Sequence, residues 1–244
     1  MKQLVQSCLG TVGLRLARLQ YVPRPPLHDF FSMLKQRGFE PAHIVDVGAN
    51  HGNWTRAALK FFPAAYYTLI EPQDNLKTYV QDLVGGDGKI RWIGMGAADK
   101  SGTLPFTISH RDDSSNFYTT PDAAKGSGQL QIDVPVATLN EIVRASRLPF
   151  PDMVKIDAEG FDLKVLAGAS ELVGKTDVFL LEAAICAPGI ENTLVKVLEA
   201  MVQAGYRAVD ITDLNRSRYG VLWLCEVAFL RRDSHLLNGD VSYE

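Results

Sequence analysis

The sequence predicts an α/β protein whose mostly parallel sheet is covered by helices on both faces. Short apolar runs alternate with segments of helical periodicity along most of the chain, which is the pattern of strands joined by crossover helices. The apolar runs are nearly continuous, as expected of parallel strands that are buried on both faces. A chain of 244 residues, 46% of them hydrophobic and 22% charged, suffices for one large domain of this class.

Residues 1–26 are predicted to form an amphipathic helix and a proline-rich connector. Apolar residues recur at helical spacing from Val5 to Leu19, and Arg15 and Arg18 interrupt them. The prolines of "YVPRPP" then prevent the helix from continuing. We find neither the uninterrupted apolar centre of a signal peptide nor a membrane-spanning stretch. The helix is expected to pack on the domain; covering an active-site mouth or touching a membrane surface peripherally are the alternatives.

The main domain is predicted to comprise residues 27–244. A first helix is expected over residues 28–37, because Gly38 is a typical helix end. Further helical patterns occur at residues 54–61, 73–84, 163–172 and 193–204. The strand candidates between and after them are "HIVDVG", "AYYTLIEP", "IRWIGMGAA", "MVKID", "VFLLEA", "YRAVDI" and "CEVAFLRR".

A polar segment at residues 102–139 interrupts the alternation. Two short alternating runs, "TLPFTIS" and "QLQIDVPVATL", flank a loop rich in Ser, Asp, Thr and Gly, which predicts a hairpin-like insertion. Long polar loops between packed elements often carry function, so the insertion is a candidate substrate lid. Its candidate substrate ligands are His110, Ser115 and Asn116, with Asp112 and Asp113 in the same loop; an ordinary solvated loop is the alternative.

Charge and cysteine content argue against several classes of protein. A formal net charge of -3 provides no basic surface of the kind that binds a phosphate backbone, so nucleic acid is not an expected partner. Cys8, Cys186 and Cys225 show no CxxC or CxxH spacing, so neither a zinc site nor a disulfide framework is expected. Free cysteines are typical of a reducing compartment, and we expect a cytoplasmic protein.

The stretch "IVDVGANHG" at residues 44–52 predicts a ligand site at the end of the first strand. In open α/β sheets, ligands bind beyond the carboxyl ends of the strands. Gly48 and Gly52 permit a close approach of the backbone there, and Asn50 offers both a donor and an acceptor. Asp46, within the strand itself, suits a ligand that carries a positive amino group.

A second acid, Glu71, ends the next strand. It lies roughly 20 residues beyond Gly52, the spacing at which a carboxylate holds the hydroxyls of a ribose. A ligand with an amino-acid end and a nucleoside end suggests S-adenosylmethionine. A nicotinamide-dependent oxidoreductase is one alternative, although the turn lacks the third glycine of GxGxxG. A catalytically silent partner subunit that retains the cofactor pocket is the other.

Taken together, these motifs resemble the FkbM family of S-adenosylmethionine-dependent methyltransferases. The resemblance covers roughly residues 44–230 and rests on "VDVGANHGNWT", "IEP", "GAADKSG", "VKIDAEGFDLKVLAGA" and "FLLEA". It implies the Rossmann-like, seven-stranded class I methyltransferase sheet with the "CEVAFLRR" strand inserted antiparallel. It also implies O-methylation of a hydroxyl on a small molecule or glycan: a sugar, a glycolipid or a secondary metabolite.

The resemblance further implies which residues hold the cofactor. They are Asp46, Gly48, Ala49, Asn50, Gly52, Thr55, Glu71, Pro72 and Ala98. Lys155, Asp157, Glu159 and Gly160 lie on the family's "KIDxEG" signature. The chain departs from the family pattern at His51, where an aliphatic residue is usual, and at Asp162, where glutamate is more common.

Three carboxylates are candidates for the proton acceptor of a methyl transfer. The reaction needs the acceptor oxygen held about 3 to 3.5 Å from the methyl carbon and a base to remove its proton. Asp157 and Glu159 follow one strand and Glu182 ends the next, and Lys155 is placed to pair with one of them. A salt bridge or a loop cap is the alternative role for each acid.

No metal site is predicted. Asp157 and Glu182 could supply oxygen ligands to magnesium, but Ala183 stands where a further polar ligand would be needed. The sequence does not identify the methyl acceptor or the oligomeric state.

Overall fold

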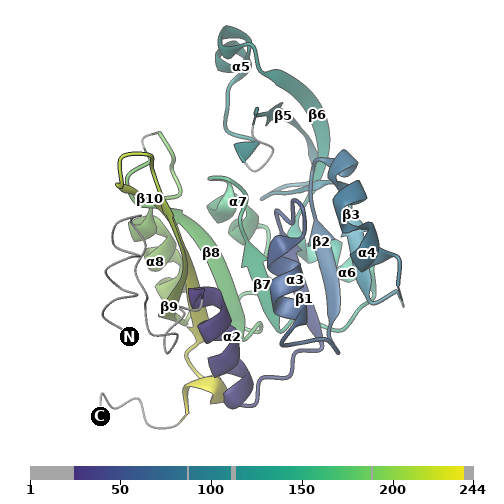
Figure 1. Ribbon diagram of the computed structural model, residues 1–244, viewed down its shortest axis with the longest axis vertical. Helices are drawn as coiled ribbons and strands as arrows, with labels where there is room; N and C mark the ends of the chain where they lie inside the picture. The colour runs from purple at the N-terminus through teal and green to yellow at the C-terminus, as the bar shows by residue number, and fades with distance from the viewer. Residues whose placement is uncertain (1–24, 87, 111–113, 188, 239–244) are drawn as a thin grey trace, which may run out of the picture.

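The computed structural model describes residues 25–86, 88–110, 114–187 and 189–238. The helix predicted within residues 1–26 lies almost wholly outside the described residues, as do Asp112 and Asp113. The described part contains a seven-stranded sheet of order β3-β2-β1-β7-β8-β10-β9 (Figure 1). Its strands are β1 (His43–Val47), β2 (Tyr66–Ile70), β3 (Ile90–Ile93), β7 (Met153–Ile156), β8 (Val178–Ala184), β9 (Tyr206–Arg216) and β10 (Leu222–Arg231).

The sheet confirms the predicted α/β fold class. Strands β3, β2, β1, β7 and β8 pair in parallel, whereas β10 pairs antiparallel with both β8 and β9. The "CEVAFLRR" strand is therefore antiparallel and lies inside the sheet. The register places Asp46 opposite Lys155 and Glu182 opposite Glu226.

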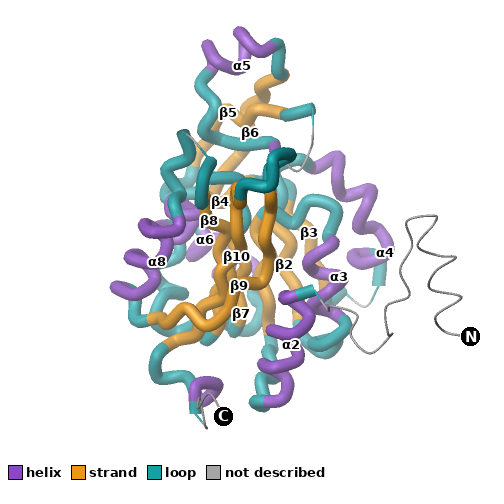
Figure 2. Tube along the Cα trace, turned by 60° about the vertical axis from the view of Figure 1, so that its left-hand side comes forward, coloured by secondary structure: helices purple, strands orange, loops and turns teal. Residues whose placement is uncertain are grey.

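Helices cover both faces of the sheet (Figures 1 and 2). Helices α2 (Pro26–Gln36), α3 (Asn53–Leu59) and α4 (Gln81–Val84), with the 3₁₀ segment η1 (Asp74–Val80), pack on one face around Phe30, Phe31 and Leu34. Helices α6 (Leu139–Ser146), α7 (Asp162–Ala167) and α8 (Leu194–Gln203) enclose a second core on the other face. Over the described ranges, none of the helices combines the length and the apolar character needed to cross a bilayer.

Local structure differs from the prediction at several places. The run "IRWIGMGAA" is not one strand: β3 ends at Ile93, and β4 (Gly96–Ala97) belongs to a second sheet. The helix predicted over residues 73–84 is divided because Val80, with φ −115° and ψ 13°, leaves the helical region. Helix α6 was not predicted, although Thr138 and Glu141 form a capping box at its start.

The insertion at residues 102–139 forms a separate layer beyond the main sheet (Figure 1). Strands β5 (Gly102–Ile108) and β6 (Leu130–Ala137) pair antiparallel, α5 (Pro121–Ser127) lies between them in sequence, and β4 completes the small sheet. The insertion approaches the main sheet where β1 and β2 end, since Phe106 and Phe117 share a cavity with Val47 and Ile70.

Candidate active site

A cavity, here called the Glu71 cavity, lies at the carboxyl ends of β1, β2 and β7. Four predicted cofactor residues line it: Gly48, Asn50, Glu71 and Pro72. Its other walls come from the main sheet, from the segment after β7 and from the insertion. They are Val47, Ile70, Gln73, Gly96, Ala97, Phe106, Ser115, Phe117, Asp157, Ala158 and Glu159. The cavity is thus polar at the strand ends and apolar on the side of the insertion.

Glu71 is the buried acid of this cavity, with 3% of its surface exposed. Its Oε2 accepts a hydrogen bond from the backbone N–H of Asn50 at 2.9 Å, and its Oε1 accepts one from Gln73 N–H at 3.0 Å. Burial raises the pKa of Glu71, and these backbone hydrogen bonds act in the opposite direction. Carboxylate oxygens accept more than one hydrogen bond, so Glu71 retains capacity for ligand hydroxyls.

Gly48 joins the turn after β1 to the end of β7. Its φ of 71° lies in the left-handed region, and a Cβ at this position would lie 1.8 Å from the carbonyl oxygen of Asp157. Glycine therefore allows the backbone of the two strand ends to touch. This contact brings the "DVGANHG" turn and the "KIDAEG" segment to one cavity.

Asp46, Thr55 and Lys155 form a buried polar network beneath that turn. Lys155 Nζ lies 3.3 Å from Asp46 Oδ1 and 3.2 Å from Asp157 Oδ2, and it donates to the carbonyl of Gly48 at 3.1 Å. Thr55 Oγ1 donates to Asp46 Oδ2 at 2.6 Å. Burial alone would lower the pKa of Lys155, but Asp157 and Asp46 outweigh it and raise this pKa above its ordinary value. Asp46 and Thr55 do not line the cavity. They support the turn indirectly, because Asp46 pairs with Lys155, which donates to the carbonyl of Gly48.

The remaining predicted cofactor residues also lie just outside the cavity lining. Ala49 is buried and donates its N–H to Ile70 O at 3.2 Å, and Gly52 is the N-cap of α3. Ala98 is buried and bonds to Ala137 O at 3.0 Å, while Gly96 and Ala97 provide the wall. The motifs located the cavity, but only part of each motif faces it.

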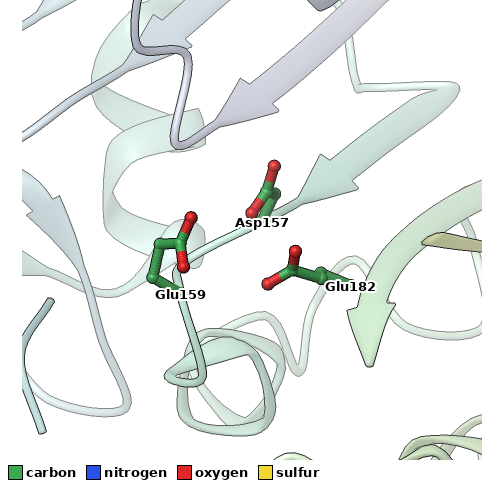
Figure 3. Close-up of side chains that lie close together, drawn as sticks. All are labelled: Asp157, Glu159 and Glu182. Atoms are coloured by element: carbon green, nitrogen blue, oxygen red, sulfur yellow. The ribbon is translucent and has the colours of Figure 1, made fainter. Parts of the chain in front are cut away.

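Asp157, Glu159 and Glu182 form a carboxylate cluster (Figure 3). One carboxylate oxygen from each lies within 4.8 Å of the other two, and the three side chains point toward one another. Burial, and then the nearby Asp157, raise the pKa of Glu182 well above its ordinary value. The cluster offers either a proton acceptor or oxygen ligands of the type that hard divalent cations prefer.

Asp162 fixes the loop that carries Glu159. Its Oδ1 accepts a hydrogen bond from Ala158 N–H at 3.2 Å, and its Oδ2 accepts one from Gly160 N–H at 3.1 Å. Glu159 adopts φ 50°, a strained conformation for a residue with a side chain. Asp162 is fully buried, and burial followed by the charge of Asp157 raises its pKa to about 7.

A second concave site, here called the Trp54 groove, lies on the α2 and α3 face of the sheet. It is lined by Pro25, Pro26, Leu27, Asn53, Trp54, Ala57, Lys155, Asp157, Glu182, Thr212, Asp213, Asn215, Leu224, Cys225 and Glu226. Asp157 lines both this groove and the Glu71 cavity. The groove therefore meets the cavity at the carboxylate cluster.

Glu226 is a functional candidate that the sequence did not reveal. It is 8% exposed, and Thr212 Oγ1 donates to its Oε1 at 2.5 Å. Burial raises the pKa of Glu226 to about 7, and Lys155 acts in the opposite direction. A single acid inside the apolar run "CEVAFLRR" was the available signal.

The predicted substrate ligands of the insertion have different surroundings. Ser115 lines the Glu71 cavity and its Oγ accepts from Ser109 N–H at 3.1 Å. Asn116 is buried and accepts from Thr119 N–H at 3.0 Å, which stabilises a turn. His110 is exposed and lines neither the cavity nor the groove.

The Glu71 cavity fits an adenosyl cofactor. A buried carboxylate with spare acceptor capacity suits ribose hydroxyls, and the apolar surfaces of Ile70, Ala97 and Phe106 suit the flat face of a base. At Gly48 the absence of a side chain leaves the turn open to close approach.

The fold and this site define a methyltransferase of the S-adenosylmethionine-dependent class. The model of the methyltransferase FkbM domain matches residues 46–208, and the chain belongs to that family.

Several known proteins are similar to this chain. The hexuronic acid methyltransferase AglP of Haloferax volcanii is 23% identical over 192 residues, which cover 77% of this chain and 72% of that protein. A precorrin-6y C5,15-methyltransferase from Geobacter metallireducens superposes with a TM-score of 0.45 at 13% identity, covering 88% of this chain and 93% of that one. A 1,6-didemethyltoxoflavin-N1-methyltransferase from Burkholderia thailandensis, with bound S-adenosylhomocysteine, has a TM-score of 0.45 at 13% identity and covers 85% and 79%.

Proposed function

We propose that this protein transfers a methyl group from S-adenosylmethionine to a hydroxyl of a sugar or a sugar-bearing molecule. The cofactor is assigned to the Glu71 cavity and the acceptor to the Trp54 groove. The observation that carries the proposal is the position of Asp157, which lines both sites and is therefore placed where donor and acceptor meet.

Binding of the cofactor is assigned to Glu71, Asn50 and the backbone at Gly48. Glu71 would accept hydrogen bonds from the two ribose hydroxyls, while the backbone N–H groups of Asn50 and Gln73 keep its carboxylate in place. The bound cofactor supplies an electrophilic methyl group.

Glu182 is assigned as the proton acceptor. It lines the groove and belongs to the carboxylate cluster, and burial raises its pKa, which makes it a stronger base than an ordinary glutamate. Asp157, held by its ion pair with Lys155 at 3.2 Å, would orient the acceptor hydroxyl. Glu159, which Asp162 holds in place through the loop, lies beside both acids.

A carbohydrate acceptor is supported by the chemistry of the groove and by the relative AglP. The groove combines an aromatic face, Trp54, with amide, hydroxyl and carboxylate groups, as recognition of a polyhydroxylated ring requires. AglP is named for methylation of a hexuronic acid.

Two measurements test the proposal. Isothermal titration should show micromolar binding of S-adenosylmethionine and S-adenosylhomocysteine, and no comparable binding of nicotinamide dinucleotides. Mass spectrometry should then detect methylated products in a panel of sugars and glycolipids. Preference for a dinucleotide would overturn the cofactor assignment. Cofactor binding without turnover on any acceptor would instead indicate a silent partner subunit.

A further inference from the structure

Carboxylates cross the sheet in a row on the face that forms the Trp54 groove. Glu182 on β8 is the direct cross-strand partner of Glu226 on β10, which in turn is the partner of Asp213 on β9. Directly opposed residues project from the same face of a sheet, and all three line the groove. Asp157, at the end of β7, continues the row.

The groove has little positive charge to balance this row. Among its described lining residues, Lys155 is the only cationic side chain, facing Asp157, Glu182, Asp213 and Glu226. Its ammonium group is already paired, at 3.3 Å with Asp46 and at 3.2 Å with Asp157. The pKa of Glu226 is raised only to about 7, so this carboxyl is mostly ionised at pH 7.5, where an anionic ligand would enter a negative field with no available counter-charge from these residues.

Neutral polar groups complete the lining. Trp54 contributes its indole ring to the lining. Asn53, Thr212 and Asn215 add amide and hydroxyl groups, which both donate and accept. Carboxylates beside such groups accept hydrogen bonds from sugar hydroxyls.

We propose that the Trp54 groove selects an uncharged sugar as the methyl acceptor and rejects the corresponding hexuronate. This inference rests on the proposed function and assigns specificity to the row Glu182, Glu226 and Asp213. The acceptor of this chain would then differ in charge from the sugar acid for which AglP is named.

The test compares matched pairs of sugars. Isothermal titration with the protein saturated with S-adenosylhomocysteine would use the methyl glycosides of glucose, galactose and mannose, each beside its uronic acid, at pH 7.5, low salt and with a chelator. At least one neutral glycoside is expected to bind, at least about tenfold more tightly than its hexuronate. The ratio of the two affinities should fall as salt is added, because screening weakens the repulsion between the hexuronate and the carboxylates of the groove.

Variants identify the source of the preference. Asp213→Asn, at an exposed position, should raise the affinity for the hexuronate relative to the neutral sugar by roughly fivefold, and Glu226→Gln should do so by at least as much. Glu199→Gln removes the same charge from the exposed side of α8, on the opposite face of the sheet, and should leave the ratio unchanged. If Glu199→Gln changes the ratio of hexuronate to neutral-sugar affinity as much as Asp213→Asn does, the preference reflects the net charge of the protein. That result would overturn the assignment of specificity to the row Glu182, Glu226 and Asp213.

Each other outcome is also decisive. Equal or tighter binding of hexuronates would overturn the inference while leaving the methyltransferase proposal intact. Hexuronate binding that appears only with magnesium would overturn it in favour of a cation held by the carboxylate cluster. Tighter binding of an amino sugar than of any neutral sugar would assign a cationic acceptor instead. If S-adenosylhomocysteine binds but no sugar does, both the inference and the sugar acceptor fail; if S-adenosylhomocysteine itself does not bind, the proposed function fails.

Discussion

Gly48 and Asp157 touch through their backbones: a Cβ on Gly48 would lie 1.8 Å from the carbonyl oxygen of Asp157. The contact joins the cofactor turn after β1 to the segment that carries the carboxylate cluster. Two strand ends that are more than 100 residues apart thereby form one site.

We expect Gly48→Ala to lose cofactor binding and to destabilise the fold by about 2 to 4 kcal/mol. The added methyl group meets a backbone atom that cannot move aside cheaply, and φ 71° is unfavourable for alanine. Chemical denaturation and titration with S-adenosylhomocysteine would measure the two effects. Gly86→Ala is the control, because a Cβ there has nothing within 4 Å; equal losses in both variants would contradict the explanation.

Glu71→Gln should weaken cofactor binding by roughly 10- to 100-fold, since hydrogen bonds to a charged acceptor contribute about 1.5 to 3 kcal/mol. Titration calorimetry would measure the change, with the exposed Glu40→Gln as a charge-matched control. Unchanged affinity in Glu71→Gln would show that the ribose contact has been assigned to the wrong acid.

Glu182→Gln should lower kcat by roughly 10²- to 10⁴-fold, the usual contribution of a positioned base. Affinity for S-adenosylhomocysteine should change little, because Glu182 lines the groove and is not among the residues of the Glu71 cavity. In the wild type, kcat should rise with pH as Glu182 loses its proton, at a higher pH than an ordinary glutamate would, because burial raises its pKa. If Glu182→Gln retains the kcat of the wild type and the same dependence of kcat on pH, Glu182 is not the base.

Stability should fall as pH rises from about 4.5 to 7.5. Asp162 and Glu226 both have pKa values raised to about 7 in the folded protein, so the folded state binds more protons than the unfolded state over this interval. Their favourable contribution is complete below the unfolded pKa and is lost as pH passes the folded pKa. Glu226→Gln should reduce the fall in the free energy of unfolding over this interval by about 3 kcal/mol, measured by denaturant unfolding across pH. If the free energy of unfolding of the wild type instead increases over this pH range, the raised pKa values of Asp162 and Glu226 would be contradicted.

Asp162→Ala should lower turnover more than it lowers cofactor affinity. It removes the acceptor of the Ala158 and Gly160 N–H groups and so releases Glu159 from its left-handed conformation. Leaving these donors unpaired costs about 1 to 3 kcal/mol each. Steady-state kinetics and titration would separate the effects, and Asp162→Glu, the residue more common in the family at this position, should restore part of the rate. Failure of glutamate to restore any activity would argue against the anchoring role.

The sequence predicted the Glu71 cavity because its chemistry lies at the ends of strands. Gly48, Glu71 and Asp157 each follow an apolar run directly, and the ends of parallel strands meet at one edge of a sheet. Asp46 was assigned to the same ligand from its charge and its place in the strand, and Thr55 from the family motif. Motif position does not distinguish a side chain that faces the ligand from one that is bonded beneath it.

The Trp54 groove could not be predicted in the same way. Trp54 and Asn53 come from α3, whereas Thr212, Asp213 and Glu226 come from the antiparallel pair β9 and β10. Only the register of β10 against β8 and β9 places Glu226 beside Glu182, and register depends on packing across the whole sheet. Within the insertion, too, the sequence did not show which side chains face the cavity. The apolar Phe106 and Phe117 line it, whereas the polar His110, a predicted substrate ligand, is exposed.

The position of β10 has a consequence for how the molecule assembles. This strand is the last of the main sheet to leave the ribosome, yet it lies between β8 and β9, which are made before it. Until residues 222–231 arrive, β8 is an open edge and β9 has no partner in the main sheet. The cofactor side can therefore fold on the nascent chain from β1, β2 and β7, whereas the acceptor side is completed only after β10 has been made.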